Sequence, residues 1–223
     1  MKLMSFGCSF MAGTDLVSPA DTWPAILAGK LQIEHQCLAR PGIGNLQIME
    51  SILDQCRHKD VIFLVNWTWI DRFDFVDVST ESWQTLRPAL DHAHADVYYR
   101  DMHSQYRDML TNLCYIYTAI NCLISLNQQF VMTYMDNLLF ESVDQNWHKS
   151  RAIQILQNKI QHHLEDWQGK NFLDWSKAGG HDISPTWHPL DSAHQAAAKY
   201  MMPRIDAILR RASQPGRWFQ SVH

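Results

Sequence analysis

Short apolar runs alternate with segments of helical periodicity along most of the chain. Four short segments predict strands, at residues 2–6, 35–38, 61–65 and 130–135. The third run, Val61-Ile62-Phe63-Leu64-Val65, is apolar at every position, which is typical of a parallel strand buried on both faces. Periodic spacing predicts helices over residues 22–31, 47–57, 97–127, 150–167 and 192–211. This alternation favours a three-layer α/β/α sandwich with a mostly parallel central sheet.

Two stretches fall outside this alternation. Residues 71–95 are rich in Asp, Trp, His and Ser, and we expect them to form a long surface excursion. Residues 215–223 begin with Pro215-Gly216 after the last predicted helix, and we expect a flexible tail there. The sequence therefore predicts one domain over residues 1–214, with an insertion-like excursion near residues 71–95.

Composition and charge exclude several classes of protein. The chain is 46% hydrophobic and 19% charged, which is enough apolar material for a buried core and excludes a disordered chain. A formal charge of −4 provides no basic field for nucleic acid. No apolar run approaches the roughly 20 residues that span a bilayer, and the N-terminus lacks the features of a signal peptide. We therefore expect a cytoplasmic protein without a nucleic-acid or membrane partner.

Cysteines and histidines give no pattern of a metal or disulfide site. The five cysteines are odd in number and lack CxxC spacing, so neither a disulfide framework nor a zinc site is expected. The histidine pairs His92/His94 and His162/His163 lack the helical spacing of metal ligands. The sequence predicts no metal and no cofactor.

Residues that can carry chemistry follow three of the predicted strands. The carboxyl ends of parallel strands meet at one edge of a sheet, where ligands bind. Ser9 follows the first strand on a strand-to-helix turn, a position that can present a nucleophilic hydroxyl. Gly44 follows the second strand and Asn66 the third, so a backbone N–H and a side-chain amide could donate to an oxyanion. Taken singly, each of these residues also fits a turn or a strand end.

Two histidines near the last predicted helix are candidates for a general base. His188 lies in a loop and is followed by Pro189, whereas His194 lies inside the predicted helix. Asp191 precedes His194 by three residues, which offers a competing Asp-x-x-His arrangement. We favour His188, because Asp191 is better placed as an N-cap or first-turn acid of the helix.

The order Ser9, Gly44, Asn66 and His188 resembles the SGNH (GDSL-like) hydrolase family, which is named for these four residue types. The motifs that carry the resemblance are Gly7-Cys8-Ser9-Phe10, Pro41-Gly42-Ile43-Gly44-Asn45, Val65-Asn66-Trp67, and His188-Pro189 with His194 six residues after His188. The resemblance spans nearly the whole chain. In motif style the chain is most similar to SGNH-like proteins of bacteriophage genomes.

The resemblance implies a serine hydrolase of the esterase or deacetylase type. Ser9 would attack an ester carbonyl and His188 would take its proton. The N–H groups of Ser9 and Gly44 and the side chain of Asn66 would form the oxyanion hole. An O-acetyl or similar ester on a carbohydrate is the favoured substrate, because indole rings stack on sugars. The candidate substrate-binding residues are Trp67, Trp69 and Arg72.

The chain departs from the family at the acid of the triad. The family usually places Asp three residues before the catalytic histidine, and Pro185 stands there in this chain. Asp182 is the nearest candidate, although a backbone carbonyl could replace the acid and leave a Ser-His dyad. This departure, with Cys8 in place of the family's usual Asp, leaves open an inactive fold that serves as a binding or structural module. An acyltransferase with the same residues is a third possibility, and the oligomeric state stays open.

Overall fold

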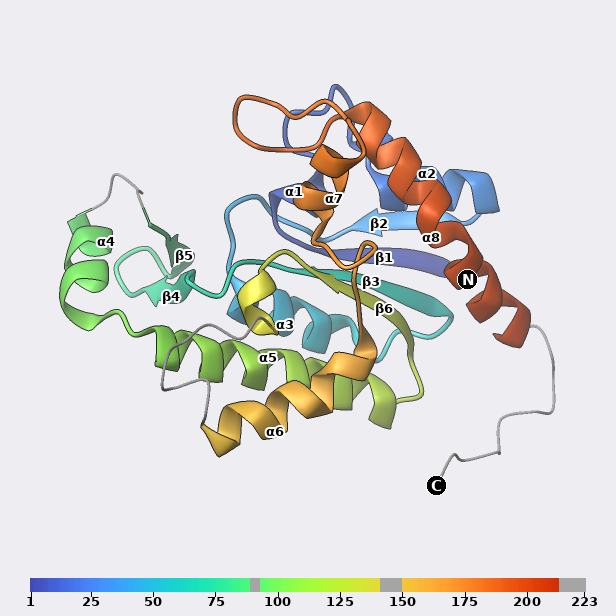
Figure 1. The fold of residues 1–223 in the computed structure, drawn as a ribbon. Helices are drawn as coiled ribbons and strands as arrows, with labels where there is room; N and C mark the ends of the chain where they lie inside the picture. Colours follow the sequence, from blue (N-terminus) through green and yellow to red (C-terminus); the bar gives the residue numbers. More distant parts are fainter. Residues whose placement is uncertain (89–92, 141–149, 213–223) are drawn as a thin grey trace.

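A central sheet of five strands organises the computed structural model, which describes residues 1–88, 93–140 and 150–212 (Figure 1). The strands lie in the order β2 (Glu34–Cys37), β1 (Lys2–Gly7), β3 (Val61–Trp67), β6 (Gln129–Tyr134) and β7 (Leu164–Glu165). Every neighbouring pair is parallel, so the carboxyl ends of all five strands meet at one edge. The predicted sheet is confirmed.

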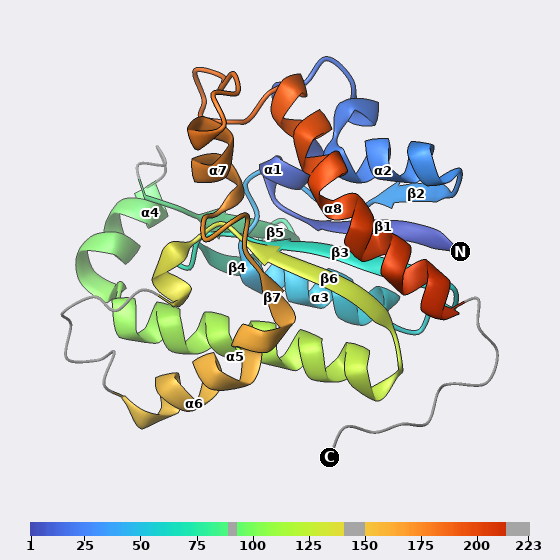
Figure 2. The same ribbon diagram turned by 45° about the vertical axis from the view of Figure 1, so that its right-hand side comes forward.

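Helices cover both faces of the sheet (Figures 1 and 2). One face packs against α3 (Asn45–Gln55), α5 (Gln105–Ser125) and α6 (Arg151–Ile160). The other packs against α1 (Ser9–Ala12), α2 (Trp23–Leu31), α7 (Phe172–Ala178) and α8 (Asp191–Ala212). The three-layer α/β/α class expected from the sequence is thereby confirmed.

The alternating direction of side chains along β3 explains its continuous apolar run. Phe63 and Val65 belong to the core on the α3 and α5 face, whereas Ile62 and Leu64 belong to the core on the α2 and α8 face. Every residue of β3 is buried, because both faces of this strand are covered by helices. None of the helices in the described ranges is long and apolar enough to cross a membrane.

Two predicted helices are shorter in the structure. The helix predicted over residues 97–127 is interrupted: α4 (Ala93–Val97) and the π-helical turn η2 (Tyr98–Met102) precede α5. Ser104, in an extended conformation, begins α5 as its N-cap and accepts a hydrogen bond from Arg107 N. The helix predicted over residues 150–167 ends at Ile160, where the 3₁₀ turn η5 (Gln161–His163) leads into β7. A strand of two residues is too short to show a period.

The predicted excursion contains regular structure. It forms the antiparallel hairpin of β4 (Phe73–Asp77) and β5 (Ser82–Leu86) and reaches into α4. The hairpin and α4 lie beyond the edge where β1 and β3 end (Figure 1). The short 3₁₀ turns η1 (Pro19–Asp21) and η3 (Asn137–Leu139) complete the fold. The predicted tail, residues 215–223, lies outside the described residues.

Candidate active site

Ser9 is the first residue of α1, directly after the carboxyl end of β1. Gly7 makes the turn possible, because its φ is +152° and a Cβ at this residue would lie only 2.7 Å from Met11 Cγ. The same Cβ would lie 2.9 Å from Asn66 O, so β1 and β3 approach closely here. The short turn brings Ser9 to the sheet edge predicted from the sequence.

His188 lies in the loop before α8, where it contacts a carboxylate. Its Nδ1 is 2.9 Å from Oδ2 of Asp15, and its ring packs on Phe10 with 5.0 Å between the ring centroids. A carboxylate accepts hydrogen bonds, so the proton of a neutral His188 is assigned to Nδ1. This tautomer leaves Nε2 as the atom that can accept a proton.

The carboxylate at His188 belongs to Asp15, which corrects the assignment of this role to Asp182. Asp182 is exposed, and in the described residues only its backbone carbonyl is engaged, by Leu190 N at 3.0 Å. Asp15 follows α1, two residues after the turn at Gly13, where φ is +79°. Its own φ is +71°. The chain thus folds back from Ser9, and Asp15 reaches a histidine 173 residues away in sequence.

Two hydroxyl groups on either side of Pro185 hold the Asp15 carboxylate. Ser184 Oγ donates to Asp15 Oδ2 at 2.6 Å, and Thr186 Oγ1 donates to the same oxygen. These hydrogen bonds, together with the one from His188, lower the pKa of Asp15 from 3.8 to about 2. Asp15 is therefore ionised at neutral pH.

Ser9 and His188 line one cavity of about 240 Å³. The lining is formed by Ser9, Phe10, Thr14, Pro41, Gly42, Trp69, Arg72, Arg87, Leu173, Thr186, Trp187 and His188. In the described part of the chain no hydrogen bond joins Ser9 to His188. The structure nevertheless brings the predicted nucleophile and the predicted base to the same hollow.

Gly44 does not present a free donor to this cavity. Its N–H donates to Asp74 Oδ1 at 2.9 Å, and a Cβ at this position would lie 2.6 Å from Asp74 Oδ2. The oxyanion role assigned to Gly44 is therefore corrected, since a carboxylate already occupies this N–H. Gly42, with a φ of +83°, lines the cavity two residues earlier in the same loop.

Asn66 lies inside β3, next to the Ser9 turn. It pairs with Gly7 in the register between β1 and β3, and it is 1% exposed. Its Oδ1 accepts a hydrogen bond from Thr133 Oγ1 at 2.9 Å, so the side-chain amide is held with its nitrogen available as a donor. Asn66 is not among the residues that line the cavity.

The three predicted substrate-binding residues separate into two groups. Trp67 is fully buried in the core on the α3 and α5 face, and its Nε1 donates to Met132 Sδ at 3.4 Å, so it cannot contact a substrate. Trp69 and Arg72 line the cavity, and the Arg72 guanidinium lies 5.0 Å from the centroid of the Trp69 ring. The difference arises because Trp67 is the last residue of β3, whereas Trp69 lies in the following loop.

Buried amides and a carboxylate hold that loop in place. Asn45 Oδ1 accepts from Thr68 N at 2.8 Å, and Asn112 Nδ2 donates to Ile70 O at 2.8 Å. Asp136 Oδ2 accepts from Ile70 N at 2.9 Å. The backbone around Trp69 is thus anchored to α3, to α5 and to the loop after β6, which gives the cavity wall a defined position.

His194 has a structural position. It is 1% exposed, and its Nδ1 accepts a hydrogen bond from Trp23 N, at the start of α2, at 3.1 Å. Burial lowers the pKa of His194 from 6.5 to about 4, so it is neutral at pH 7. His188, in contrast, has a carboxylate partner and lines the cavity. The geometry therefore favours His188 over His194 as the base.

Several residues of the candidate site were missed in the sequence, among them Asp15, Trp187 and Arg87. Asp15 and Trp187 escape notice because their role depends on the fold, although Trp187 directly precedes His188. Arg87 directly follows β5, inside the excursion, where no periodicity marks it. In the described residues, no group of three or more His, Cys, Asp or Glu side chains could hold a metal ion.

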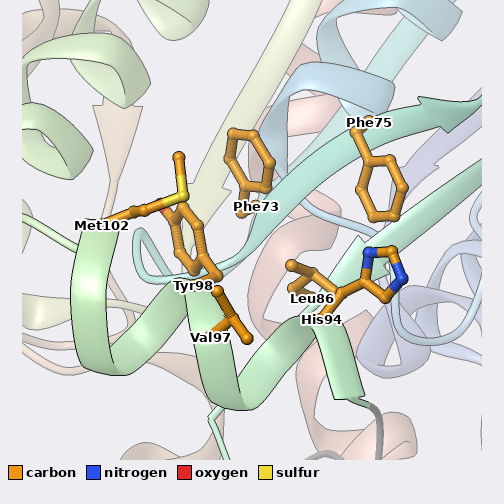
Figure 3. Close-up of a pocket in the computed structure, with 7 residues that line it drawn as sticks. All are labelled: Phe73, Phe75, Leu86, His94, Val97, Tyr98 and Met102. Carbon is orange, nitrogen blue, oxygen red and sulfur yellow. The ribbon is translucent and has the colours of Figure 1, made fainter.

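A second and larger cavity lies under the hairpin and holds none of the predicted catalytic residues (Figure 3). Its volume is about 510 Å³. Its lining is mostly apolar and comes from β4, β5, α4 and η2: Phe73, Phe75, Leu86, His94, Val97, Tyr98 and Met102. Because it contains neither Ser9 nor His188, the smaller cavity is the candidate active site.

Comparisons with known proteins show a shared fold. The chain aligns over 91% of its length with a member of the lipolytic protein G-D-S-L family from Veillonella parvula, covering 97% of it at 12% identity and a TM-score of 0.50. It aligns over 94% with the esterase EstA from Pseudoalteromonas sp., covering 98% at 13% identity and a TM-score of 0.52. A carbohydrate esterase family 2 enzyme from Corynascus thermopiles matches over 94% of this chain and 66% of its own, at 14% identity and a TM-score of 0.53. No protein-family model and no curated protein matches the sequence.

Proposed function

We propose that the protein is a serine esterase of the SGNH type, with Ser9 as nucleophile, His188 as general base and Asp15 as the orienting acid. The observation that carries this proposal is the contact of 2.9 Å between His188 Nδ1 and Asp15 Oδ2, at a cavity that Ser9 also lines. The fold shared with two esterases and a lipolytic protein supports it.

The proposed reaction is acyl transfer in two steps. Ser9 Oγ attacks the ester carbonyl carbon while its proton moves to His188 Nε2, and the resulting imidazolium is stabilised by ionised Asp15. The intermediate collapses when His188 gives this proton to the leaving alcohol, which yields an acyl-serine. Water then attacks the carbonyl carbon of the acyl-serine while His188 takes its proton, and His188 returns this proton to Ser9 Oγ as the C–O bond breaks and the acid is released.

The developing oxyanion needs donors, and three groups near Ser9 can supply them. We assign this role to the backbone N–H groups of Ser9 and Gly42 and to the side-chain amide of Asn66. Gly42 takes the place of Gly44, whose N–H donates to Asp74. Each such donor contributes on the order of 3 kcal/mol to stabilisation of the transition state in other acyl-transfer enzymes.

An O-acetyl or similar ester on a carbohydrate remains the favoured substrate. Trp69 and Trp187 line the cavity, and Trp187 is 62% exposed. Arg72 lies over one face of Trp69 and Lys177 over one face of Trp187, so the opposite faces are the ones that could stack on a sugar. The alternative of an inactive binding module was motivated by the absence of an acid before His188. Asp15 supplies a carboxylate at His188, and this weakens the argument for an inactive module.

Hydrolysis of 4-nitrophenyl acetate by the wild type, Ser9→Ala and His188→Ala tests the proposal. We expect each substitution to lower kcat by at least about 10³-fold, because nucleophile and base act as a unit. A fluorophosphonate should label the wild type and leave Ser9→Ala unlabelled. A wild type that neither hydrolyses esters nor takes the label would favour the binding module instead.

A further inference from the structure

Positive charge is concentrated in the proposed active site of a chain whose formal charge is −4. Among the described residues that line the cavity, Arg72 and Arg87 carry a permanent charge, and none is Asp or Glu. The ionised Asp15 contacts two lining residues, but its carboxylate is already engaged by Ser184, Thr186 and His188. A cleft lined by one sign of charge raises the local concentration of ligands of the opposite sign. The lining therefore favours an anionic substrate over a neutral one.

Arg87 is carried into the cavity by an anchored strand end. Leu86 is buried and lines the apolar cavity of Figure 3, while the next residue, Arg87, lines the cavity of Ser9. Arg87 directly follows the last residue of β5, and successive side chains of an extended chain point to opposite sides, which agrees with this division. Tyr99 Oη donates to Leu86 O at 3.1 Å and Thr85 Oγ1 donates to Asp74 Oδ1 at 2.6 Å, so the backbone just before Arg87 is tethered.

The two guanidinium groups retain donors for a ligand. Arg72 uses Nη1 to donate to Ile43 O at 2.7 Å and stacks on Trp69. Arg87 makes no hydrogen bond or ion pair with any residue in the described ranges. A guanidinium has five N–H donors in a planar fork that matches the two oxygens of a carboxylate. Arg87 thus has its whole fork available at the cavity, and Arg72 has part of it.

We propose that the natural ester carries a carboxylate, which Arg87 binds in the cavity with support from Arg72. This inference rests on the proposed esterase function and names its substrate class. The carboxylate can belong to the acyl group or to the alcohol, and the same charge recognition serves either. A carboxylate on the substrate is compatible with a carbohydrate ester if the sugar or its acyl group is acidic.

The test compares esters that differ in one negative charge. On the alcohol side the pair is 4-acetoxybenzoate and its neutral methyl ester; on the acyl side it is 4-nitrophenyl hydrogen succinate and neutral 4-nitrophenyl butyrate. We expect wild-type kcat/KM to favour the anionic member of at least one pair by about tenfold or more, and added salt to reduce this preference. The pair that shows the preference identifies the side that carries the carboxylate.

Arg87→Gln removes the charge and should bring the anionic-to-neutral ratio of kcat/KM close to one. Arg87→Lys, which keeps the charge and loses the fork, should retain part of the preference. Arg57→Gln is the matched control, because Arg57 is an exposed arginine that lies shortly after α3, before β3 begins, and it should keep the wild-type ratio.

Two results overturn the inference, and they are distinguishable. If the wild type hydrolyses the neutral esters as well as the anionic ones, or if Arg87→Gln keeps the wild-type ratio, the carboxylate proposal fails while the esterase function stands. If the wild type hydrolyses none of the four esters and takes no fluorophosphonate label, the esterase function fails, and this inference falls with it.

Discussion

At the scale of single residues, Asp15, Ser184 and Thr186 show how the proposed site would obtain the acid that Pro185 cannot supply. Pro185 occupies the position where the SGNH family usually has its Asp, and a proline side chain cannot orient an imidazole. The residues on either side of it carry hydroxyl groups, and both donate to the carboxylate of Asp15. The loop before His188 thus binds an acid that comes from the other end of the chain.

Asp15→Asn tests this replacement. An amide in place of the carboxylate no longer favours the proton on His188 Nδ1, so we expect kcat/KM for 4-nitrophenyl acetate to fall by about 10² to 10⁴-fold. Asp182→Asn is the matched control and should stay within about twofold of the wild type, because the Asp182 side chain is exposed. The reverse result, with activity lost in Asp182→Asn alone, would return the acid to Asp182.

At the scale of elements, Asp74 fastens the β4–β5 hairpin to α3. Its carboxylate accepts hydrogen bonds from Gly44 N at 2.9 Å, Gln47 N at 3.1 Å and Gln47 Nε2 at 2.8 Å. It also accepts one from Thr85 Oγ1 on the partner strand. A carboxylate at a helix N-terminus is favoured by the unpaired N–H groups and by the helix dipole. Asp74 thereby connects the helix that begins at Asn45 with the strand that ends just before Arg87.

Removal of this carboxylate should destabilise the fold measurably. In Asp74→Ala the buried N–H groups of Gly44 and Gln47 lose their acceptor, so we expect the free energy of unfolding to fall by about 3 kcal/mol. Asp77→Ala, in the same strand, is the matched control and should leave the urea midpoint close to that of the wild type, because the Asp77 side chain accepts hydrogen bonds from Ser79, which is exposed. Urea unfolding measures the stability of both variants. Equal midpoints for Asp74→Ala and the wild type would contradict the stabilising role of the Asp74 hydrogen bonds.

At the scale of the whole molecule, His194 connects the last helix to the first part of the chain. The hydrogen bond from Trp23 N, 171 residues away, requires a neutral ring, and burial keeps the folded-state pKa of His194 at about 4. Because the unfolded chain binds this proton near pH 6.5, the contribution to stability is complete above pH 6.5 and is lost as the pH falls toward 4.

This linkage predicts a pH-dependent stability. We expect the wild-type free energy of unfolding to fall by up to about 3 kcal/mol between pH 6.5 and pH 4 through His194. His194→Gln, which cannot titrate, should show a shallower decline over this range in urea unfolding. If the free energy of unfolding fell equally with pH in both proteins, the linkage to His194 would be contradicted. The lowered pKa of Asp15 acts in a separate window, since its contribution is lost only as the pH falls from 3.8 toward 2.

Much of the architecture follows from the sequence by itself. Apolar runs and helical periods are local properties, so four of the five strands of the central sheet and most helices could be predicted, with the sheet edge where Ser9 lies. Parallel strands bring their carboxyl ends together, so the same pattern also predicted a candidate site at the strand ends marked by Ser9, Gly44 and Asn66. The interrupted helix before Gln105 and the two-residue strand β7 could not be predicted, because Ser104 and such a short strand leave no periodic signal.

The partners of the site residues were decided only by the tertiary structure. Asp15 meets His188 across 173 residues, Asp74 takes the N–H of Gly44, and Trp67 turns into the core while Trp69 lines the cavity. These contacts depend on where distant loops return to the sheet edge and on which face each side chain occupies. Local spacing carries no information on either, so the sequence by itself determined where the candidate site lies, and only the tertiary structure decided which groups meet there.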